Sequence, residues 1–333
     1  MEKIGVLGAG TWGIALTRVL ANAGHHVTVW SALEKEVEEL SATRVHPNLP
    51  GMEIPASVGF TKSIQEVCEG KAVLLFAVPS VFVRDTAKKA APYVKEGQII
   101  LDVAKGIEAD TLFTMTQVIS DEIRNPRVPV VAFSGPTHAE EVAKDLPTTI
   151  VAASEELEVA QKIQAIFADT CIRVYTNTDV FGVELCGAMK NVMALAAGAA
   201  TGIGYGDNTK AAIITRGIAE ICRLGMAMGC KIETFLGLAG IGDLIVTATS
   251  IHSRNNRCGM LLGQGVPPEE AIRQVGMVVE GVNALPAAIK LAEAYKVEMP
   301  ITEAVNAVVN GGASAKDQVH ALMHREQKPE IIL

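Results

Sequence analysis

Aromatic residues are scarce in this chain of 333 residues: they make up 4% of it, although 49% of its residues are hydrophobic. A composition poor in aromatics and rich in alanine, valine and glycine is typical of helices packed closely around a parallel sheet. No low-complexity segment, block of like charge or internal repeat stands out. The length allows two globular domains, each with its own core.

The chain also lacks excess positive charge and a long hydrophobic run. Its formal net charge is −8, which argues against nucleic acid or an anionic membrane surface as the main partner. The longest apolar stretch, around 192–203, is short and rich in alanine and glycine. We therefore expect a buried helix there and no membrane insertion. Met1 and Glu2 run directly into the first expected strand, so we expect no signal peptide.

Paired cysteines and metal-ligand clusters are missing as well. None of the six cysteines belongs to a C-x-x-C pair, and most lie in apolar contexts. We expect reduced core thiols in a cytoplasmic protein. His320 and His324 stand four residues apart, but no third ligand is near them in the sequence. We expect no metal site.

What the chain does contain is a glycine motif at its very start. A short apolar run at 4–7 leads into Gly8-Ala9-Gly10-Thr11-Trp12-Gly13, and a helix-compatible stretch follows. In a strand–turn–helix context, Gly8 permits the tight turn and Gly10 lets the backbone approach a pyrophosphate, while Gly13 lets helix and strand pack closely. The pyrophosphate then lies at the positive end of the helix. The motif predicts a dinucleotide site.

Strand-like and helix-like stretches alternate through the first half of the chain, and the second half is helical. We predict a Rossmann-type, mostly parallel, doubly wound sheet in a dinucleotide-binding domain at 1–180. An all-helical substrate-binding and catalytic domain follows at 181–333, with the ligand cleft between the two. The predicted strands are 4–7, 27–30, 72–77, 98–103, 128–133, 148–153 and 172–175; the predicted helices are 11–23, 63–69, 81–94, 157–167, 181–198, 210–228, 269–275, 283–294 and 302–310.

Lys190 is the first candidate catalytic residue. It lies in a stretch, 183–197, that is apolar nearly all round. An ammonium group in a buried helix needs a partner or a chemical role, because an unpaired buried charge is costly. One interpretation is a structural ion pair or a lysine that reaches solvent. The other is a proton donor made more acidic by burial, and by a second lysine.

Two loops after predicted strands supply further candidates. Lys105 follows the strand at 98–103, at the sheet edge where doubly wound folds bind ligands. Gly135 and Thr137 lie in a Gly-Pro turn after the strand at 128–133, and their backbone amide and hydroxyl can face a ligand. His138 is a rival acid–base candidate. Plain solvent exposure is the alternative for Lys105 and His138.

A third cluster comes from the helical half. A glycine-rich stretch at 237–242 presents Asp243, and Ser253-Arg254-Asn255 supplies a hydroxyl, a guanidinium and an amide in succession. That set suits a phosphate dianion, which accepts several hydrogen bonds and favours bidentate arginine. An exposed polar loop is the alternative.

These segments and several others follow one another in a recognisable order. They are Gly8–Gly13, Ala104-Lys105-Gly106, Ser134-Gly135-Pro136-Thr137, Lys190-Asn191-Val192 with Gly204-Tyr205-Gly206-Asp207-Asn208-Thr209-Lys210, Gly240-Ile241-Gly242-Asp243, Ser253-Arg254-Asn255 and Val279-Glu280-Gly281. Together they resemble the bacterial NAD(P)-dependent sn-glycerol-3-phosphate dehydrogenase family, over nearly the whole chain.

The resemblance implies an enzyme that interconverts dihydroxyacetone phosphate and glycerol 3-phosphate for phospholipid synthesis. It implies Lys190 as proton donor, Lys105 as the group that orients the substrate and stabilises the alkoxide, and Asp243 as the residue that positions Lys190. The implied substrate-binding positions are Lys105, Gly135, Thr137, Lys190, Asp243, Ser253, Arg254 and Asn255. The implied cofactor-binding positions are Gly8, Gly10, Thr11, Trp12, Gly13, Lys105, Ala139, Arg254, Val278 and Glu280.

The chain departs from the family's pattern after its second strand, which is followed by Ser31-Ala32-Leu33. No acidic residue is present there for a ribose 2′-hydroxyl, and the Arg or His that relatives often carry for a 2′-phosphate is missing too. NAD and NADP both stay open, with a lean to NADP(H).

Two other functions remain as alternatives: a related two-domain dehydrogenase of 3-hydroxy acids or 6-phosphogluconate, and a regulatory protein that senses dinucleotide without turnover. The Ser-Arg-Asn loop and the 204–210 run disfavour the first. Lys190 with Lys105 and Asp243 would be unnecessary for the second. Relatives are usually homodimers, and we expect the same here.

Overall fold

The computed structural model describes residues 1–327 and 329–330. These residues form two compact units. The sheet unit comprises 1–105 and 113–184, and the helical unit comprises 106–112 together with the described residues from 185 onward. Lys290 of the helical unit donates a hydrogen bond to the carbonyl of Ala109 (2.7 Å), which ties the short segment at 106–112 to that unit. The domain boundary between residues 180 and 181 stays a prediction.

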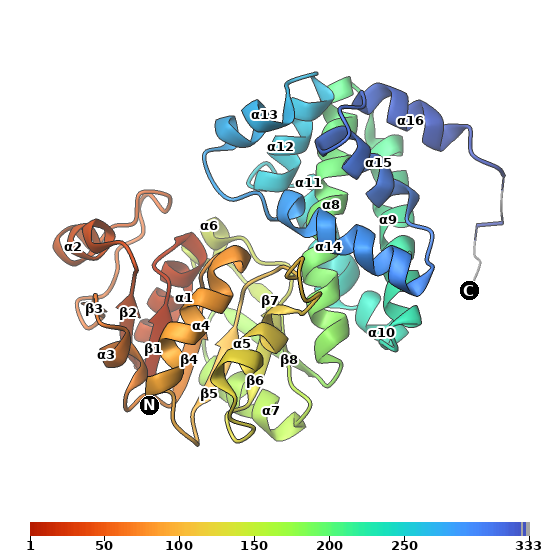
Figure 1. Cartoon of the computed structure of the whole chain (residues 1–333). Helices are drawn as coiled ribbons and strands as arrows, with labels where there is room; N and C mark the ends of the chain where they lie inside the picture. Colours follow the sequence, from red (N-terminus) through yellow and green to blue (C-terminus); the bar gives the residue numbers. More distant parts are fainter. Residues whose placement is uncertain (328, 331–333) are drawn as a thin grey trace. The chain divides into compact units, whose positions relative to one another are not determined.

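The sheet unit contains one eight-stranded sheet with the order β3-β2-β1-β4-β5-β6-β7-β8 (Figure 1). Neighbouring strands run parallel except β6 and β7, which are antiparallel. The mostly parallel, doubly wound sheet is therefore confirmed. The strands are β1 (Lys3–Leu7), β2 (His26–Trp30), β3 (Gly59–Thr61), β4 (Val73–Phe76), β5 (Ile99–Asp102), β6 (Val130–Ser134), β7 (Thr148–Ala153) and β8 (Ile172–Asn177).

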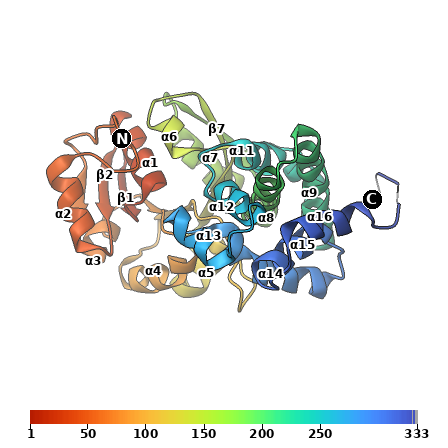
Figure 2. The same cartoon turned by 90° about the horizontal axis from the view of Figure 1, so that it is seen from above.

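Helices cover both faces of this sheet, which explains why its central strands are nearly continuous apolar runs. Side chains of α1 (Thr11–Asn22), α6 (Ala139–Val142) and α7 (Leu157–Ile166) belong to one buried cluster. Side chains of α3 (Ile64–Cys68), α4 (Val83–Ala90) and α5 (Met115–Ile123) belong to another. Figure 2 shows α1, α6 and α7 on one side of the sheet and α4 and α5 on the other. One more helix, α2 (Glu34–Thr43), follows β2.

Several short elements differ from the sequence prediction. Strand β3 has only three residues, too few for a recognisable alternation. The helix expected at 81–94 is α-helical only at 83–90 and is flanked by single 3-10 turns at Ser80–Phe82 and Ala91–Tyr93. Pro92 lacks the amide hydrogen that an α-helix would need, so the chain tightens into a 3-10 turn there.

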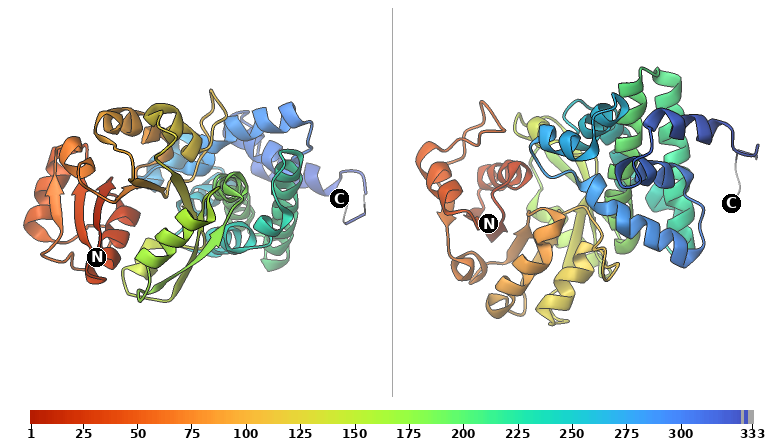
Figure 3. Two further views of the ribbon diagram at one scale, coloured as in Figure 1. Left: turned by 90° about the horizontal axis from the view of Figure 1, so that it is seen from below. Right: turned by 45° about the horizontal axis from the view of Figure 1, so that its top comes forward.

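The helical unit is built around α8 (Val180–Ile203), the long green helix in Figure 3. This helix is apolar and long enough to cross a membrane, yet 83% of its most hydrophobic window is buried within the structure, as in the core helix of a globular fold. The 18-residue segment Ile232–Thr249 meets the same length and hydropathy criteria but is divided among three short elements. The other helices are α9 (Asp207–Ala227), α10 (Ile232–Phe235), the π-helix η3 (Leu238–Gly242), α11 (Asp243–Thr249), α12 (Arg254–Gly263), α13 (Pro268–Val275), α14 (Glu280–Tyr295), α15 (Pro300–Val309) and α16 (Ala315–Met323).

Helices α8 and α12 touch backbone to backbone through glycines spaced four residues apart on each. A Cβ at Gly198 or Gly202 of α8 would overlap the carbonyl oxygens of Asn256 or Met260 on α12. A Cβ at Gly259 or Gly263 of α12 would likewise overlap carbonyl oxygens of α8. Only glycine allows helices to approach this closely, so the two helices are fixed against each other.

Candidate functional site

The glycine motif forms the turn between β1 and α1 at the carboxyl edge of the sheet. Gly8 has a φ of +118°, and a Cβ there would lie 2.6 Å from the carbonyl oxygen of Ala77, just after β4. A Cβ on Gly13 would lie 2.6 Å from the Gly8 oxygen, whereas one on Gly10 would meet nothing within 4 Å. Gly8 and Gly13 are thus required by packing, and Gly10 faces open space.

These residues fit a dinucleotide cofactor. Strands β1 and β4 flank the point where the strand order reverses, which is where doubly wound folds bind ligands. Helix α1 begins there with no capping side chain and no acidic residue in its first turn. Its first amides and dipole are therefore suited to a pyrophosphate approaching over Gly10.

Thr11 and Trp12 are the first two residues of α1, directly after the glycine turn. The side-chain amide of Asn48 donates to Thr11 Oγ1 (3.3 Å), and Trp12 packs partly buried against the core beneath the sheet. Asn48 comes from the loop after α2, so that loop is joined to the start of α1.

Lys105, Gly135 and Thr137 lie together on the loops after β5 and β6. Lys105 Nζ donates to the carbonyl of Gly135 (3.1 Å), and Thr137 Oγ1 donates to the same oxygen (3.1 Å). Gly135 packs against the backbone of Ile150 on β7, where a Cβ would lie 3.0 Å from its Cα. Ala139 begins α6 nearby in the chain and is buried.

The ends of β5 and β6 also carry buried polar groups. Burial raises the pKa of Asp102 well above its usual range, and the nearby carboxylate of Glu184 raises it further. Asp102 Oδ2 and Ser134 Oγ are buried without a hydrogen-bond partner among the described residues. Glu184 itself accepts from Thr114, and from the amide and hydroxyl of Thr116. Burial therefore favours the neutral form of the Asp102 carboxyl, which lies at the end of β5, just before the Lys105 loop.

In the helical unit, Lys190 of α8 lies against α11. Its Nζ donates to Asp243 Oδ1 (2.7 Å) and to Thr247 Oγ1 (2.6 Å). The side chains of Lys190 and Asp243 are 7% and 1% exposed. Thr247 Oγ1 donates in turn to the backbone oxygen of Asp243, one turn earlier on α11 (2.7 Å). The predicted pairing of Lys190 with Asp243 is present, and Thr247 is an additional partner.

The Ser-Arg-Asn segment forms the start of α12. Ser253 is its N-cap and accepts from the amide of Asn256 (3.2 Å), and the first turn holds no acidic residue. Arg254 is partly exposed and forms no hydrogen bond or ion pair with the described residues. A helix N-terminus with a hydroxyl and a guanidinium is a suitable anion site.

Asn255 differs from its two neighbours because it is buried. Its Nδ2 donates to Asn191 Oδ1 of α8 (2.9 Å), and its Oδ1 accepts from the amide of Gly281 on α14 (2.8 Å). Asn255 therefore links three helices next to the anion site. Its contact with the substrate stays a prediction.

The remaining cofactor candidates are divided between the units. Val278 precedes α14 and is partly buried, and Glu280 is the first residue of α14. Both belong to the helical unit, as does Arg254, whereas Thr11, Trp12, Lys105 and Ala139 belong to the sheet unit. Their joint contact with one cofactor stays a prediction.

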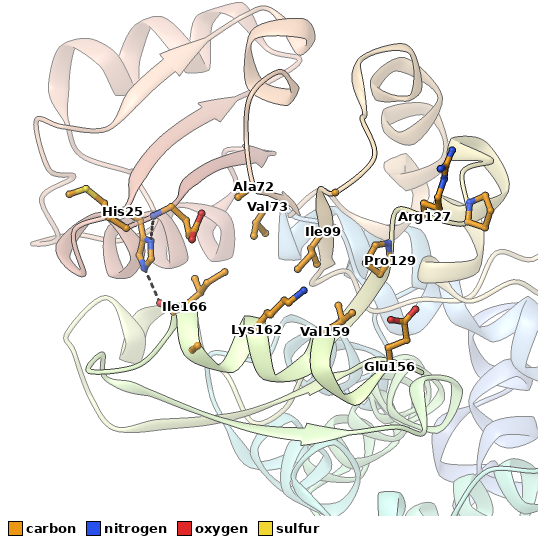
Figure 4. A pocket seen from close by; sticks show the side chains of 15 residues that line it. His25, Ala72, Val73, Ile99, Arg127, Pro129, Glu156, Val159, Lys162 and Ile166 are labelled. Atoms are coloured by element: carbon orange, nitrogen blue, oxygen red, sulfur yellow. Dashed lines mark hydrogen bonds between the residues drawn. The ribbon is translucent and has the colours of Figure 1, made fainter.

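A separate hollow of the sheet unit lies away from these residues. A cavity of about 710 Å³ opens at the amino edge of the sheet, beside His25, Val73, Ile99, Pro129 and Ile166 (Figure 4). Val73 and Ile99 begin β4 and β5, so the cavity is at the opposite edge from the glycine motif. Across the described residues, no three His, Cys, Asp or Glu side chains gather as a metal site.

Sequence spacing did not single out Thr247, Asn191 or the loop residue Asn48 as parts of the site. Thr247 could have been predicted, because it stands four residues after Asp243 and therefore lies on the same face of the helix. Asn191 directly follows Lys190 but points to a partner 64 residues away, which spacing alone does not reveal.

Comparison with known proteins assigns the family. Residues 3–160 match the N-terminal part of NAD-dependent glycerol-3-phosphate dehydrogenase, and residues 179–320 match its C-terminal part. The chain belongs to this family.

Similar proteins agree over the full length. The chain is 63% identical to NAD(P)+ glycerol-3-phosphate dehydrogenase 2 of Lactobacillus delbrueckii subsp. bulgaricus, with 99% of both chains covered. It is 53% identical to the NAD(P)+ glycerol-3-phosphate dehydrogenase of Agathobacter rectalis, covering 99% of this chain and 98% of that one. The crystal structure of glycerol-3-phosphate dehydrogenase from Coxiella burnetii superimposes with a TM-score of 0.93 at 35% identity, covering 97% of this chain and 99% of the other. The resemblance noted from the sequence motifs is confirmed.

Proposed function

We propose that this chain, an NAD(P)-dependent oxidoreductase that acts on a CH–OH group, reduces dihydroxyacetone phosphate to sn-glycerol 3-phosphate. The membership of the dehydrogenase family supports the class of reaction. The observation that carries the mechanism is the buried ammonium of Lys190, held by Asp243 and Thr247.

The residues of the chain provide binding, orientation and a proton. When bound, the nicotinamide cofactor supplies the hydride, which adds to the carbonyl carbon of the substrate. Lys190 gives a proton to the carbonyl oxygen as that oxygen gains charge, and is reprotonated before the next turnover. Positioned proton transfer of this kind contributes roughly 10²–10⁴-fold in rate. Asp243 keeps the Lys190 ammonium in place, and Lys105 stabilises the developing alkoxide.

The phosphate group of the substrate is assigned to the start of α12. Ser253 and Arg254 offer hydroxyl, guanidinium and helix-amide donors there, which suit a dianion. Fixing the phosphate orients the carbonyl carbon for hydride transfer, so binding energy at this end contributes to turnover.

The proposal also covers the pathway, the cellular location and the oligomeric state. The product is the backbone of phospholipids, and we assign the enzyme to phospholipid synthesis in the cytoplasm, acting as a homodimer. Light scattering on the purified protein tests the dimer directly.

The reaction is tested by following the absorbance of NADH, and separately NADPH, after addition of dihydroxyacetone phosphate. Rapid oxidation with at least one cofactor is expected, with sn-glycerol 3-phosphate as the product. Oxidation of 3-hydroxy acids or 6-phosphogluconate by NAD+ or NADP+, but no reaction with dihydroxyacetone phosphate, would assign the chain to another substrate class. Tight cofactor binding without turnover of any of them would indicate a sensor.

A further inference from the structure

Three features of the sheet unit meet at the end of β2, and no step of the mechanism uses them. The amide of Gly8 donates to the carbonyl of Trp30, the last residue of β2 (2.9 Å). The glycine turn is thereby tied to the residue before Ser31. In doubly wound folds the end of the second strand is the place where the adenosine ribose of a dinucleotide is recognised.

Ser31 is buried there and holds a carboxylate. Its hydroxyl donates to Glu36 Oε2 and accepts from the amide of Leu33 (3.1 Å). Glu36 lies in the first turn of α2 and is only partly exposed. An acidic group therefore occupies this position after all, because the chain turns back through α2 and brings Glu36 onto Ser31.

Within the described residues, no ion pair joins Glu36 to a basic side chain. His46 is buried, and its Nδ1 accepts from the amide of Asn48 (3.1 Å), while the ring also bonds to the backbone of Ala9 in the glycine turn. Burial lowers the pKa of His46 despite the nearby Glu36. His46 is therefore a neutral support between the glycine turn and the Asn48 loop.

Basic side chains on and close to α2 have other partners. Lys62 is paired with Glu34 and Glu38, and Lys35 lies 3.6 Å from Glu39. Arg44 donates to the carbonyl of Val58 and lies over the ring of Phe60. With four glutamates and one lysine, α2 presents an acidic surface.

We infer that Glu36, held in place by Ser31, makes this enzyme select NAD(H) over NADP(H). A carboxylate accepts hydrogen bonds from the two free ribose hydroxyls of NAD(H). A 2′-phosphate would bring a second negative group beside Glu36 and the acidic α2, while Lys62 and Arg44 already have other partners. The inference rests on the cofactor part of the proposed function and reverses the lean to NADP(H) drawn from residues 31–33 alone.

The test measures binding, so it needs no substrate. NADH and NADPH are titrated against the purified protein and followed by cofactor fluorescence, and NAD+ and NADP+ are compared by calorimetry. The wild type is expected to bind NADH at least about tenfold more tightly than NADPH, the scale of one hydrogen bond to a charged group. Glu36→Gln is expected to remove most of that difference, mainly by improving the affinity for NADPH.

Glu39→Gln is the matched control, since it removes the same charge from the same helix at an exposed position beside Lys35. It is expected to leave the NADH-to-NADPH ratio within about twofold of the wild type. Ser31→Ala, which frees Glu36 without removing it, is expected to lie between the wild type and Glu36→Gln.

Three results would overturn the inference: equal or tighter binding of NADPH by the wild type, an unchanged ratio in Glu36→Gln, or an equal change in Glu39→Gln. If NADH is preferred and Glu36→Gln removes the preference, the inference holds even where dihydroxyacetone phosphate is not reduced. Such a result would refute the proposed substrate alone.

Discussion

Lys190 Nζ lies 2.7 Å from Oδ1 of Asp243, and both side chains are buried, so a buried ion pair joins α8 to α11. Such a pair contributes little net stability when intact, but the loss of one partner leaves an uncompensated buried charge. In the proposed mechanism this pair holds the proton-donating ammonium at one defined position, and so links the fold of the helical unit to catalysis.

Removing the carboxylate tests that coupling. We expect Asp243→Ala to lower the free energy of unfolding by about 3–5 kcal/mol and to reduce kcat. Thr247→Val keeps the shape and removes only the hydroxyl, so we expect a drop in kcat with a smaller loss of stability, of about 1–2 kcal/mol. Urea unfolding and steady-state kinetics measure both. Equal stability of Asp243→Ala and wild type would contradict the buried pair.

Removing the ammonium tests the proton donor. Lys190→Met is expected to lower kcat by roughly 10²–10⁴-fold, because the variant lacks the assigned proton donor, while the Kd for cofactor stays close to that of the wild type. Lys316→Met, at an exposed position on α16, is the control for a lost lysine charge. Near-normal turnover by a folded Lys190→Met protein would rule out the assignment.

The anion site makes a separate prediction for Arg254. We expect Arg254→Ala to raise KM for dihydroxyacetone phosphate and also to lower kcat, since the phosphate contact aligns the carbonyl. Arg257, one turn further along α12 and exposed, provides the matched control. Arg257→Ala should leave KM within about twofold, as expected for an exposed charge away from the site. An unchanged KM in Arg254→Ala would place the phosphate elsewhere.

The buried carboxyl of Glu220 predicts how the free energy of unfolding changes with pH. Its carboxyl is buried and accepts from the amide of Ile301 (2.7 Å), at the start of α15. Burial raises its pKa from 4.5 to about 7, so the folded state holds its proton more tightly than the unfolded state. Stability from this group is complete below about pH 4.5 and falls as the pH rises to about 7, by about 3 kcal/mol in total.

Glu220→Gln should flatten that fall. Between pH 4.5 and pH 8, the free energy of unfolding measured in urea is expected to fall less in the variant than in the wild type. Identical slopes of stability against pH for the two proteins would show that Glu220 does not titrate in this range.

The close glycine contact between α8 and α12 predicts that adding a methyl group there destabilises the protein. Gly259→Ala places a Cβ against the carbonyl oxygen of Leu195, so the helices must separate; we expect a loss of about 1–3 kcal/mol in unfolding free energy. Gly59→Ala in β3 is the control, because its Cβ would meet nothing closer than 3.8 Å. Thermal unfolding midpoints compare the two. A Gly259→Ala protein as stable as the wild type would show that the backbones do not touch.

Much of the fold followed from the sequence because its signals are local. The glycine motif and the apolar strands predicted the sheet, and a charge inside an apolar helix singled out Lys190. Its partner Asp243 was expected from the family resemblance, and the contact is present.

What the sequence did not reveal depends on the chain folding back. Residues 31–33 contain no acidic side chain, yet Glu36 bonds to Ser31 because α2 begins immediately afterwards. Asn255 was expected at the phosphate. Its burial between Asn191 and Gly281 could not be predicted without knowing how α8, α12 and α14 pack. The contacts of Asn255 join residues that are distant along the chain, and no periodicity encodes either them or the hydrogen bond from Ser31 to Glu36.

The glycine contact of α8 with α12 also restricts how this enzyme can evolve. An overfilled core position is usually rescued by a smaller side chain opposite, but here the opposing atom at each of the four glycines is a carbonyl oxygen. No second substitution on the facing helix can make a carbonyl smaller. Reversion, or a shift of a whole helix, is then the remaining route, so compensatory mutations for changes at Gly198, Gly202, Gly259 and Gly263 should be rare in any library selected for activity.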